Sequence, residues 1–457
     1  MSDSLLVQNL RREYAESTIA ILGFGREGQS SYRLLKSIWP EKEVAVFEQQ
    51  PKIENFFVGE MAELPTFLTD FNQLSQYQVI FKTPAIALSE SYVQAAVQHG
   101  SHVTSQLNEF LKVYRQQAIG VTGTKGKSTT SALIAHCLKV VGQPTLLAGN
   151  IGLPLFEIAS KIVSETTVVA EMSSYQLDSV QFSPHVAVMV NLFPEHLNYH
   201  GSLENYGKAK ANITRFQTAN DLFFFHPEFT EIQNLTTDSV AQKIPFLKNL
   251  PTEIAAVVES LPLATIIKKE NIPAAVTVLQ KLGIDDQKII RALKTFEGLP
   301  HRLQKVVTVN DVQFIDDTLA TIPEATVAAL SAFPRVDVVI LGGFDRGIEY
   351  QKVVDAVIEN KVKSVAFFPP SGLKMLEDLE KRYSAEKRPI TRVVETMAEA
   401  VEFAFEHAEA GGTVLLSPAS PSFGRFANYE QKSAEFVREV HRLAEVSSES
   451  QPKASST

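Results

Sequence analysis

The chain has 457 residues, of which 44% are hydrophobic and 21% charged, as in a globular protein of several domains. Its net charge of −9 argues against a nucleic-acid-binding protein, because such proteins carry an excess of basic residues. Its one cysteine, Cys137, allows no intramolecular disulfide and favours a reducing compartment. The start of the chain lacks a signal-peptide core, and no apolar run reaches membrane-spanning length. We therefore expect a cytoplasmic protein that acts on small molecules, as a monomer, with no nucleic-acid or membrane partner.

A glycine-rich turn between a strand and a helix opens the first predicted domain. The segment TIAILGFGREGQSSYRLLKSI at 18–38 predicts strand, turn and helix, and EVAVFE at 43–48 predicts the next strand. Glycine at all three spaced positions of GFGREG, with Glu48 at the end of the second strand, is the dinucleotide fingerprint in its proper context. Alone, this pattern is as typical of a nicotinamide-dependent dehydrogenase as of another nucleotide-binding domain. Two further strands and a helix are expected at 79–82, 101–104 and 107–115.

The segment GVTGTKGKSTT at 120–130 predicts a phosphate-binding loop between a strand and a helix. Its glycines let backbone N–H groups turn toward a phosphate, while Lys127 can reach the terminal phosphates and Ser128 can ligate magnesium. Val121 stands where a strict phosphate loop has glycine, so the match is to a shorter GTKGKS form, and a chance Gly/Lys/Ser turn is the alternative. The loop predicts a nucleoside triphosphate, bound by Gly123, Thr124, Lys125, Gly126, Lys127, Ser128 and Thr129.

Polar residues follow the next two predicted strands. Glu171 closes TTVVAE, and Glu195 and His196 come just after HVAVMVN. Ligands bind at the carboxyl ends of parallel strands, and Mg²⁺ takes one or two carboxylates together with phosphate oxygens. A lone glutamate at such a place is more often a capping or surface residue, and a lone histidine is more often structural. Their common position after a phosphate loop favours a magnesium site.

The last third of the chain carries further candidate ligands at strand ends. Asp316 and Asp317 follow an apolar strand, where adjacent acids fit hydrogen bonds to a ribose or a cation, or the cap of the following helix. Arg346 follows another strand, where it can clamp a carboxylate or remain solvated. The serine-rich turn at 417–423 can hold an anion or stabilise its own loop. The strands of this part are expected at 312–316, 336–341, 364–368 and 413–416.

The chain is therefore predicted to be an α/β protein of three domains. The first and third are Rossmann-like, and the central one is P-loop ATPase-like with a mostly parallel sheet, since its strands are largely apolar. The elements of the central domain are expected at 117–121, 129–141, 166–171, 185–191 and 203–216, with helices within 261–296 and a linker at 298–302. The predicted boundaries are 1–112, 113–302 and 303–446, and the polar tail at 447–457 is expected to be disordered.

Several segments occur in an order that is far more specific than any one of them. They are GVTGTKGKST, GNIG at 149–152, EMSSYQ at 171–176, NLFPEH at 191–196, GLPHR at 298–302, and LLSPAS followed by NYEQ. In this order they resemble the Mur ligase family along nearly the full chain, and GNIG and EMSSYQ are similar to the glutamate-adding members. The resemblance implies an ATP- and Mg²⁺-dependent ligase that adds glutamate, with D-glutamate favoured, to UDP-N-acetylmuramoyl-L-alanine in peptidoglycan precursor synthesis.

The resemblance also implies a mechanism and a role for the first domain. The substrate carboxylate would attack the γ-phosphate of ATP, and the amino group of glutamate would displace the resulting acyl phosphate. Such chemistry asks the protein mainly to align the reactants and neutralise phosphate charge. The first domain would bind uridine diphosphate, which removes the main support for a dehydrogenase.

Carried over position by position, the resemblance assigns roles to residues of all three domains. Lys127, His196 and Lys210 are implied as catalytic, and Ser128, Glu171, His196 and a carbamylated Lys210 as magnesium ligands. Further ATP contacts are implied at Asn271, Arg302 and Asp317. The implied substrate contacts are Gly25, Glu48 and Thr83 for the uridine diphosphate, Asn150, Ser173 and Gln176 nearer the phosphates, and Thr321, Arg346, Ser422 and Tyr429 for the carboxylates of glutamate.

The chain departs from the family pattern at three places. Leu319 stands where the family has lysine after the paired acids, Ala85 replaces a glycine, and the helix start at 270–274 lacks a histidine and a second asparagine. The leucine removes one positive charge from the glutamate side, so ligation of L-glutamate is the alternative substrate preference. Two functions of a different class compete with ligation: a nucleotide-binding protein without ligase activity, and an NAD-dependent oxidoreductase.

Overall fold

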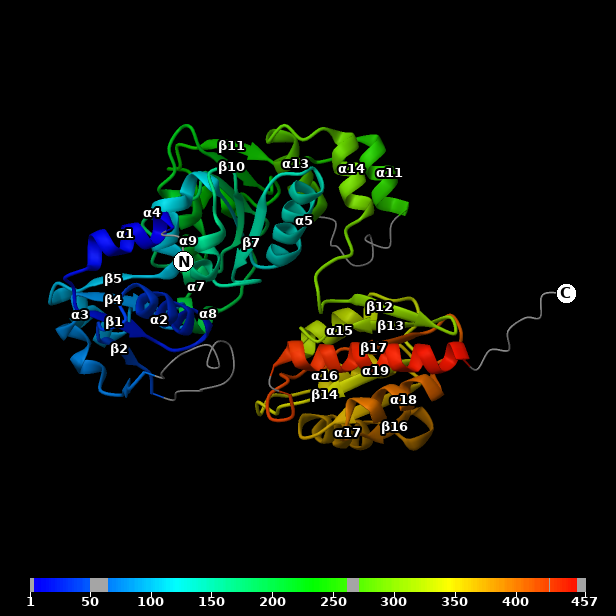
Figure 1. Ribbon diagram of the computed structural model, residues 1–457. Coiled ribbons are helices and arrows are strands. Elements are labelled where there is room, and N and C mark those ends of the chain that lie inside the picture. Colours follow the sequence, from blue (N-terminus) through cyan, green and yellow to red (C-terminus); the bar gives the residue numbers. More distant parts are fainter. Residues whose placement is uncertain (1–3, 50–64, 261–270, 427, 450–457) are drawn as a thin grey trace. The chain divides into compact units, whose positions relative to one another are not determined.

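The computed structural model describes residues 4–49, 65–260, 271–426 and 428–449. They form two compact units, at 1–296 and 297–457, of which the first contains two sheets and the second contains one (Figure 1). The three sheets follow one another along the chain and are almost entirely parallel, which confirms the predicted α/β class. The three predicted domain boundaries stay predictions.

The first sheet has five parallel strands in the order β3-β2-β1-β4-β5. Along β1, Ile19 and Ile21 pack into one hydrophobic core and Ala20 and Leu22 into another, so both faces of the strand are buried. The strands are β1 (Ile19–Leu22), β2 (Val44–Phe47), β3 (Phe67–Leu68), β4 (Val79–Lys82) and β5 (His102–Thr104). The helices are α1 (Leu5–Tyr14), α2 (Arg26–Ile38), η2 (Phe71–Gln76), α3 (Ser91–Gln98) and α4 (Gln106–Tyr114).

The glycine turn of this sheet is closely packed. A Cβ on Gly28 would lie 2.2 Å from the carbonyl oxygen of Gly23, whereas a Cβ on Gly25 would have no heavy atom within 4 Å. Gly28 therefore allows α2 to approach the end of β1, and the space beside Gly25 stays open. The predicted order of strand, glycine turn and helix is confirmed, and the binding role of the turn stays a prediction.

The central sheet has six parallel strands in the order β11-β10-β9-β6-β8-β7. The strands are β6 (Ala118–Thr122), β7 (Thr145–Gly149), β8 (Thr167–Glu171), β9 (Val186–Met189), β10 (Leu222–Phe225) and β11 (Gln242–Pro245). The longer helices are α5 (Lys127–Val140), α9 (Leu203–Arg215), α11 (Thr252–Ser260), α13 (Asn271–Lys281) and α14 (Asp286–Lys294). Shorter turns of helix are η3 (Arg115–Gln117), α6 (Leu155–Ile158), η4 (Ala159–Lys161), α7 (Ser174–Leu177), α8 (Leu197–His200) and α10 (Thr230–Leu235).

One continuous hydrophobic core joins the first and central sheets. It includes Ile21 and Phe81 from the first sheet, Phe156 from α6, and Ala170 and Phe223 from the central sheet. The helix α6 packs against both α2 and α4. This shared core accounts for the two sheets forming one compact unit.

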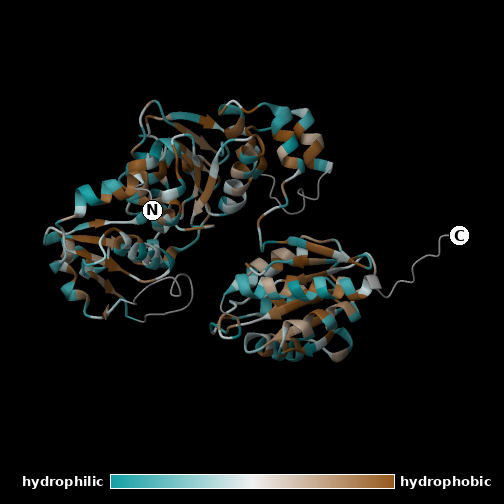
Figure 2. Ribbon diagram, in the orientation of Figure 1, coloured by the Kyte–Doolittle hydropathy of each residue, from teal (hydrophilic) through white to brown (hydrophobic). Residues whose placement is uncertain are grey.

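The third sheet has six strands in the order β12-β13-β17-β14-β15-β16, and only the β12–β13 pair is antiparallel. Hydrophobic residues concentrate on its strands, while polar residues lie on the outer helix faces (Figure 2). The strands are β12 (Gln304–Val309), β13 (Val312–Asp316), β14 (Val338–Gly342), β15 (Ser364–Phe368), β16 (Ile390–Val393) and β17 (Thr413–Leu416). The helices are α15 (Pro323–Ser331), α16 (Gln351–Glu359), α17 (Ser371–Arg382), η5 (Ala385–Lys387), α18 (Met397–His407) and α19 (Tyr429–Glu449).

The predicted disordered tail, 447–457, begins too early, because residues 447–449 are helical. Helix α19 continues through 447–449, although these three residues are polar. The rest of the predicted tail, 450–457, lies outside the described residues. Among the helices that the structure describes, none is long and apolar enough to span a bilayer.

The close approach at Gly28 predicts the effect of a methyl group at this position. Gly28→Ala is expected to destabilise the protein by about 1–3 kcal/mol, because the new Cβ meets backbone atoms that cannot move without displacing α2. Thermal and guanidinium unfolding of the whole chain measure the effect. Gly25→Ala, which adds the same methyl group in open space, should cost less than about 1 kcal/mol. Equal losses in the two variants would contradict the packing argument.

Candidate active site

The phosphate loop leaves the carboxyl end of β6, which lies between β8 and β9 in the middle of the central sheet. Gly126 has a φ of +80°, and a Cβ there would lie 2.2 Å from Oδ1 of Asn271. Only glycine fits this left-handed position beneath the asparagine, and α5 begins at the next residue, Lys127. The predicted order of strand, loop and helix is therefore confirmed, and Asn271 lies against the loop, while its contact with ATP stays a prediction.

The side chain of Asn191 holds the loop in shape. Its Oδ1 accepts hydrogen bonds from the backbone N–H of Thr124 at 3.0 Å and of Lys125 at 2.9 Å, and its Nδ2 donates to the carbonyl of Lys125 at 3.0 Å. The sequence motifs assign Asn191 no role of its own. The sequence nevertheless contains a signal for this role. Asn191 follows an apolar strand next to a phosphate loop, so its amide is expected to be buried and to need hydrogen-bond partners, which the loop can supply.

Two lysines lie against the loop carbonyls. Nζ of Lys127 donates to the carbonyl of Thr124 at 3.0 Å, and Nζ of Lys210, on α9, donates to the carbonyl of Gly123 at 2.8 Å. Lys210 is 1% exposed and its ammonium lies 4.6 Å from the ring centre of Tyr206. Burial lowers the pKa of Lys210 well below its usual value, and the nearby charge of Lys127 lowers it further. Burial and the neighbouring charge therefore shift Lys210 toward its neutral form.

Glu171 offers a buried carboxylate beside the loop. It ends β8 in register with Val121 of β6 and is 2% exposed. Its Oε1 accepts a hydrogen bond from Nδ2 of Asn150 at 2.8 Å, while Oε2 is buried without a hydrogen-bond partner among the described residues. An orphaned carboxylate oxygen is costly unless a donor or cation completes it, so this arrangement fits a magnesium ligand.

His196 lies at the start of α8 in the left-handed conformation, with a φ of 56°. Burial lowers the pKa of His196, the charges of Lys210 and Lys127 act in the same direction, and the carboxylate of Glu195 opposes them. The neutral imidazole that results is the form that ligates metal ions. Glu195 itself forms an ion pair with Lys125 of the loop.

Glu171 and His196 thus lie near the loop that carries Ser128, and their binding of a metal ion stays a prediction. Within the part of the chain that the structure describes, no three histidine, cysteine, aspartate or glutamate side chains converge as metal ligands. The set formed by Glu171, His196 and the hydroxyl of Ser128 fits a magnesium ion that takes its remaining ligands from phosphates and water.

The segment after β8 also has a structural role. Ser173 and Gln176 form a capping box at the start of α7, in which Oε1 of Gln176 accepts from the backbone N–H of Ser173 at 2.8 Å. Nε2 of Gln176 donates to Oε1 of Glu27, on α2, at 2.6 Å. Burial raises the pKa of Glu27 to about 7, against the effect of this hydrogen bond and of the Lys82 charge. The amide of Gln176 thus connects the central sheet to the glycine turn, and its substrate contact stays a prediction.

The candidate uridine diphosphate residues also lie at strand ends. Oε2 of Glu48 accepts from the backbone N–H of Phe24 at 3.0 Å, and Oγ1 of Thr83 donates to the carbonyl of Leu22 at 3.0 Å. With the open space beside Gly25, these contacts place Gly25, Glu48 and Thr83 around the same turn.

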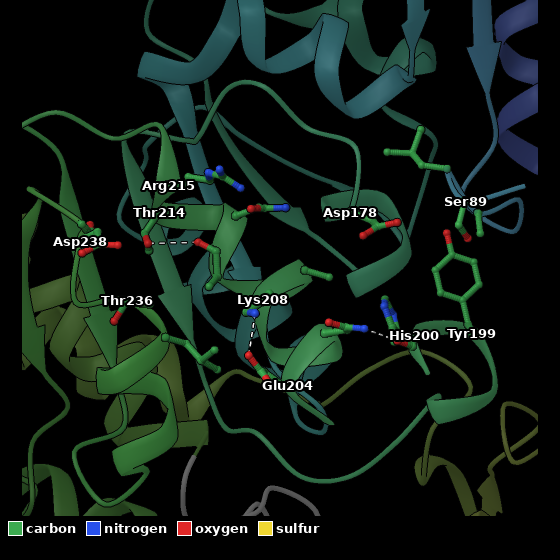
Figure 3. Close-up of a pocket in the computed structure, with 18 of the residues that line it drawn as sticks. Ser89, Asp178, Tyr199, His200, Glu204, Lys208, Thr214, Arg215, Thr236 and Asp238 are labelled. Carbon is green, nitrogen blue, oxygen red and sulfur yellow. Dashed lines mark hydrogen bonds and ion pairs between the residues drawn. The ribbon is translucent and has the colours of Figure 1, made fainter. Parts of the chain in front are cut away.

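A cavity of about 970 Å³ lies beside this site but does not include it (Figure 3). Its walls include Asp178, His200, Lys208, Arg215 and Asp238, so it lies along the face of α9 opposite Lys210. None of the candidate site residues lines it.

In the 297–457 unit, Asp317 follows β13 as a buried carboxylate. Its Oδ2 accepts from the hydroxyl of Ser417 at 2.7 Å and its Oδ1 from the backbone N–H of Leu303 at 3.2 Å. Burial raises the pKa of Asp317 to about 7, although these hydrogen bonds and the charge of Arg302 act against it. The predicted ATP contacts Arg302 and Asp317 are thus brought near each other. The neighbouring Asp316 is a structural residue, because it accepts from His301 and Ser433.

The residues expected to hold glutamate come from loops of the same unit. The backbone N–H of Phe344 donates to the carbonyl of Pro421 at 2.8 Å, which ties the loop of Arg346 to the loop of Ser422. Arg346 is exposed, whereas Ser422 is 3% exposed and its hydroxyl has no hydrogen-bond partner within the described residues. Thr321 precedes α15 and Tyr429 begins α19.

The pKa of Asp317 predicts a pH dependence of stability. The folded protein keeps this proton up to about pH 7, whereas the unfolded chain loses it near the ordinary value of 3.8, so the folded state binds more protons between these limits. The contribution of Asp317 to stability is therefore full below about pH 4 and falls as the pH rises to about 7. Relative to wild type, Asp317→Asn should gain stability between about pH 5 and pH 8, on the order of 1–2 kcal/mol. Thermal midpoints of both proteins test this, and parallel pH profiles would contradict it.

Known proteins match this chain along most of its length. The family model for the Mur ligase middle domain matches residues 121–261, and that for the Mur ligase glutamate ligase domain matches residues 301–420. The chain is 31% identical over 456 residues to the UDP-N-acetylmuramoylalanine--D-glutamate ligase of Bacillus cytotoxicus, covering 94% of this chain and 99% of that protein. It is also 31% identical over 458 residues to the ligase of the same name from Bacillus anthracis, with the same coverage.

Solved structures share the fold at lower sequence identity. The UDP-N-acetylmuramate-alanine ligase MurC of Thermotoga maritima has a TM-score of 0.55 at 18% identity and covers 94% of this chain and 100% of its own. The MurF ligase of Thermotoga maritima, in complex with ADP, has a TM-score of 0.52 at 17% identity and covers 94% of this chain and 97% of its own. With a phosphate loop between β6 and α5, and with relatives matched along almost their entire length, this chain belongs to the Mur ligase family.

Proposed function

We propose that this protein is an ATP-dependent ligase that adds D-glutamate to UDP-N-acetylmuramoyl-L-alanine in peptidoglycan precursor synthesis. The observation that carries the proposal is the similarity, over 94% of this chain and 99% of the relative, to a protein named UDP-N-acetylmuramoylalanine--D-glutamate ligase. Family membership supports the ligase chemistry, and the relative's name supplies the substrates. The protein is further proposed to act as a cytoplasmic monomer.

In the proposed reaction the phosphate loop binds the phosphates of ATP. The first turn of α5 presents backbone N–H groups and a partial positive charge to them, and Lys127 neutralises the transferred phosphoryl group. Ser128, Glu171 and His196 would hold Mg²⁺. When bound, the ion supplies charge that stabilises the phosphoryl group during transfer. Asn191 keeps the loop N–H groups aligned while this happens.

The buried Lys210 supports the carbamylation implied by the family resemblance. Its neutral amine is the form that attacks carbon dioxide, and the carbamate forms as the nitrogen loses a proton. The product carries two oxygens in place of an ammonium group. It would add a carboxylate-like ligand near Glu171 and would relieve the repulsion between Lys210 and Lys127.

The remaining roles are proposed for groups at the strand ends of each unit. Gly25, Glu48 and Thr83 would bind the uridine diphosphate, and Asn150, Ser173 and Gln176 would lie nearer the reacting carboxylate. Asn271, Arg302 and Asp317 would contact ATP. Arg346, Ser422, Thr321 and Tyr429 would hold the carboxylates of the incoming glutamate, for which the exposed guanidinium of Arg346 supplies a bidentate donor.

L-Glutamate is the second candidate substrate, and Leu319 is the observation that favours it. Leu319 donates its backbone N–H to the carbonyl of His301 and supplies no charge where the family has lysine. The loss of one cation changes how the two carboxylates of the amino acid are held, which is where a preference for the other enantiomer would arise.

A paired assay tests the proposal. With UDP-N-acetylmuramoyl-L-alanine, ATP and Mg²⁺, D-glutamate should release ADP and phosphate and yield the ligated nucleotide, and L-glutamate should react more slowly. A preference for L-glutamate would establish the second candidate. The absence of product with both enantiomers would leave a non-catalytic nucleotide-binding protein, and binding of a nicotinamide cofactor would instead support an oxidoreductase.

The phosphate-loop lysine gives a second test. Lys127→Ala should lower kcat by about 10²-fold or more, since the transferred phosphoryl group loses its neutralising charge, while the thermal midpoint stays near that of wild type. Lys139→Ala, on the exposed end of the same helix, is the matched control and should keep wild-type activity. Wild-type rates in Lys127→Ala would show that the loop is not the site of phosphoryl transfer.

A further inference from the structure

A lysine is buried beneath the loops of the 297–457 unit where the amino acid is proposed to bind. Lys432, in the first turn of α19, is 0% exposed. Its Nζ donates to the carbonyl of Gly342 at 2.8 Å and lies 5.3 Å from the ring centre of Phe368 and 5.5 Å from that of Phe426. No ion pair found among the described residues includes Lys432, so its ammonium group has a carbonyl and two ring faces as partners but no carboxylate.

The charged groups near Lys432 do not neutralise its ammonium group. Arg425 adds a second positive charge, and the carboxylate of Asp316 is already engaged by His301 and Ser433. Burial lowers the pKa of Lys432 to about 7, the charge of Arg425 lowers it further, and Asp316 opposes both. Burying an amine without a counter-ion costs more than burying an apolar side chain of similar volume, so its contribution to stability alone does not account for it.

Lys432 lies directly under two loops of the candidate amino-acid site. A Cβ on Gly343 would lie 3.6 Å from Nζ of Lys432 and 2.3 Å from the carbonyl oxygen of Pro421, so the ammonium, the turn after β14 and the serine-rich loop are in contact. The first of these loops carries Arg346. The second carries Ser422, whose buried hydroxyl lacks a hydrogen-bond partner in the described part of the chain. An unpaired cation and an unsatisfied hydroxyl beside the same turn are the groups that a carboxylate would complete.

We propose that Lys432 is a positioning and specificity-determining residue for the incoming amino acid. Its ammonium group holds the turn at Gly342, and its unpaired charge attracts the carboxylate that the loops of Arg346 and Ser422 receive. The inference rests on the proposed ligase function. It assigns to the amino-acid site a second cation, the buried Lys432, in addition to the exposed Arg346. The ligand class is an amino-acid carboxylate.

Two neutral variants test this inference. Lys432→Met retains the length of the side chain without charge or donor, and Lys432→Gln retains a donor for the carbonyl of Gly342 without charge. In the ligase assay both should raise the KM for glutamate by about tenfold or more, with kcat and the KM for ATP within about twofold of wild type. The thermal midpoint of Lys432→Met should equal or exceed that of wild type, because the uncompensated buried charge is gone.

Controls separate this inference from a structural role and from the ligase proposal. Lys381→Met makes the same change on the exposed face of α17 and should leave both KM values unchanged. The inference is overturned if Lys432→Gln keeps the wild-type KM for glutamate, or if Lys432→Met lowers stability and all kinetic constants together. If wild type itself gives no product, the ligase proposal fails. The inference on Lys432 is then tested by calorimetry, which measures the binding of D- and L-glutamate to wild type and to Lys432→Gln. Tighter binding to wild type supports the inference, and equal or absent binding overturns it.

Discussion

The side-chain amide of Asn191 sets the shape of the phosphate loop, and the rest of the site depends on that shape. A loop rich in glycine has many accessible conformations, so its N–H groups point toward a phosphate only if other contacts restrict them. Asn191 supplies three such contacts from the end of β9, and Asn271 covers Gly126 from α13. Lys210 donates to the carbonyl of Gly123, so the proposed metal ligand Lys210 is positioned by the same loop.

The protein retains buried polar groups that weaken its folded state. Lys210 and Lys432 are amines inside the protein, and Glu171 keeps one carboxylate oxygen without a partner among the described residues. Each raises the free energy of the folded state unless a ligand or modification completes it. All three belong to, or lie beneath, the loops at strand ends that are proposed to bind phosphate, metal and amino acid. A cost at positions beside proposed binding loops is typical of groups kept for binding.

The sequence predicts most of the architecture because its strands are buried on both faces. The predicted strands, such as 79–82 and 364–368, are largely apolar runs that the structure pairs with a neighbour on both sides. Strands β7, β10 and β11 of the central sheet are not among the predicted strands. For β11 the reason is that QKIP is polar and lies at the sheet edge, where only one side is paired. Strand β10 is apolar and lies between β9 and β11, so its omission has no such reason. The antiparallel strand β12 also lies at a sheet edge and is not among the predicted strands. Its residues alternate between partly buried and exposed, which carries a weaker signal than a continuous apolar run.

The residue types of the site follow from the sequence, but their connections do not, because these join positions far apart in the chain. Gln176 illustrates this limit. Its amide serves both as the cap of α7 and as the donor to Glu27, 149 positions away, so no local pattern indicates the pairing. This hydrogen bond also bears on the proposed function. The segment that follows the metal-side carboxylate Glu171 is hydrogen-bonded to the first turn of the helix beside Gly25, so the proposed nucleotide turn and the proposed metal site are held in register within one compact unit.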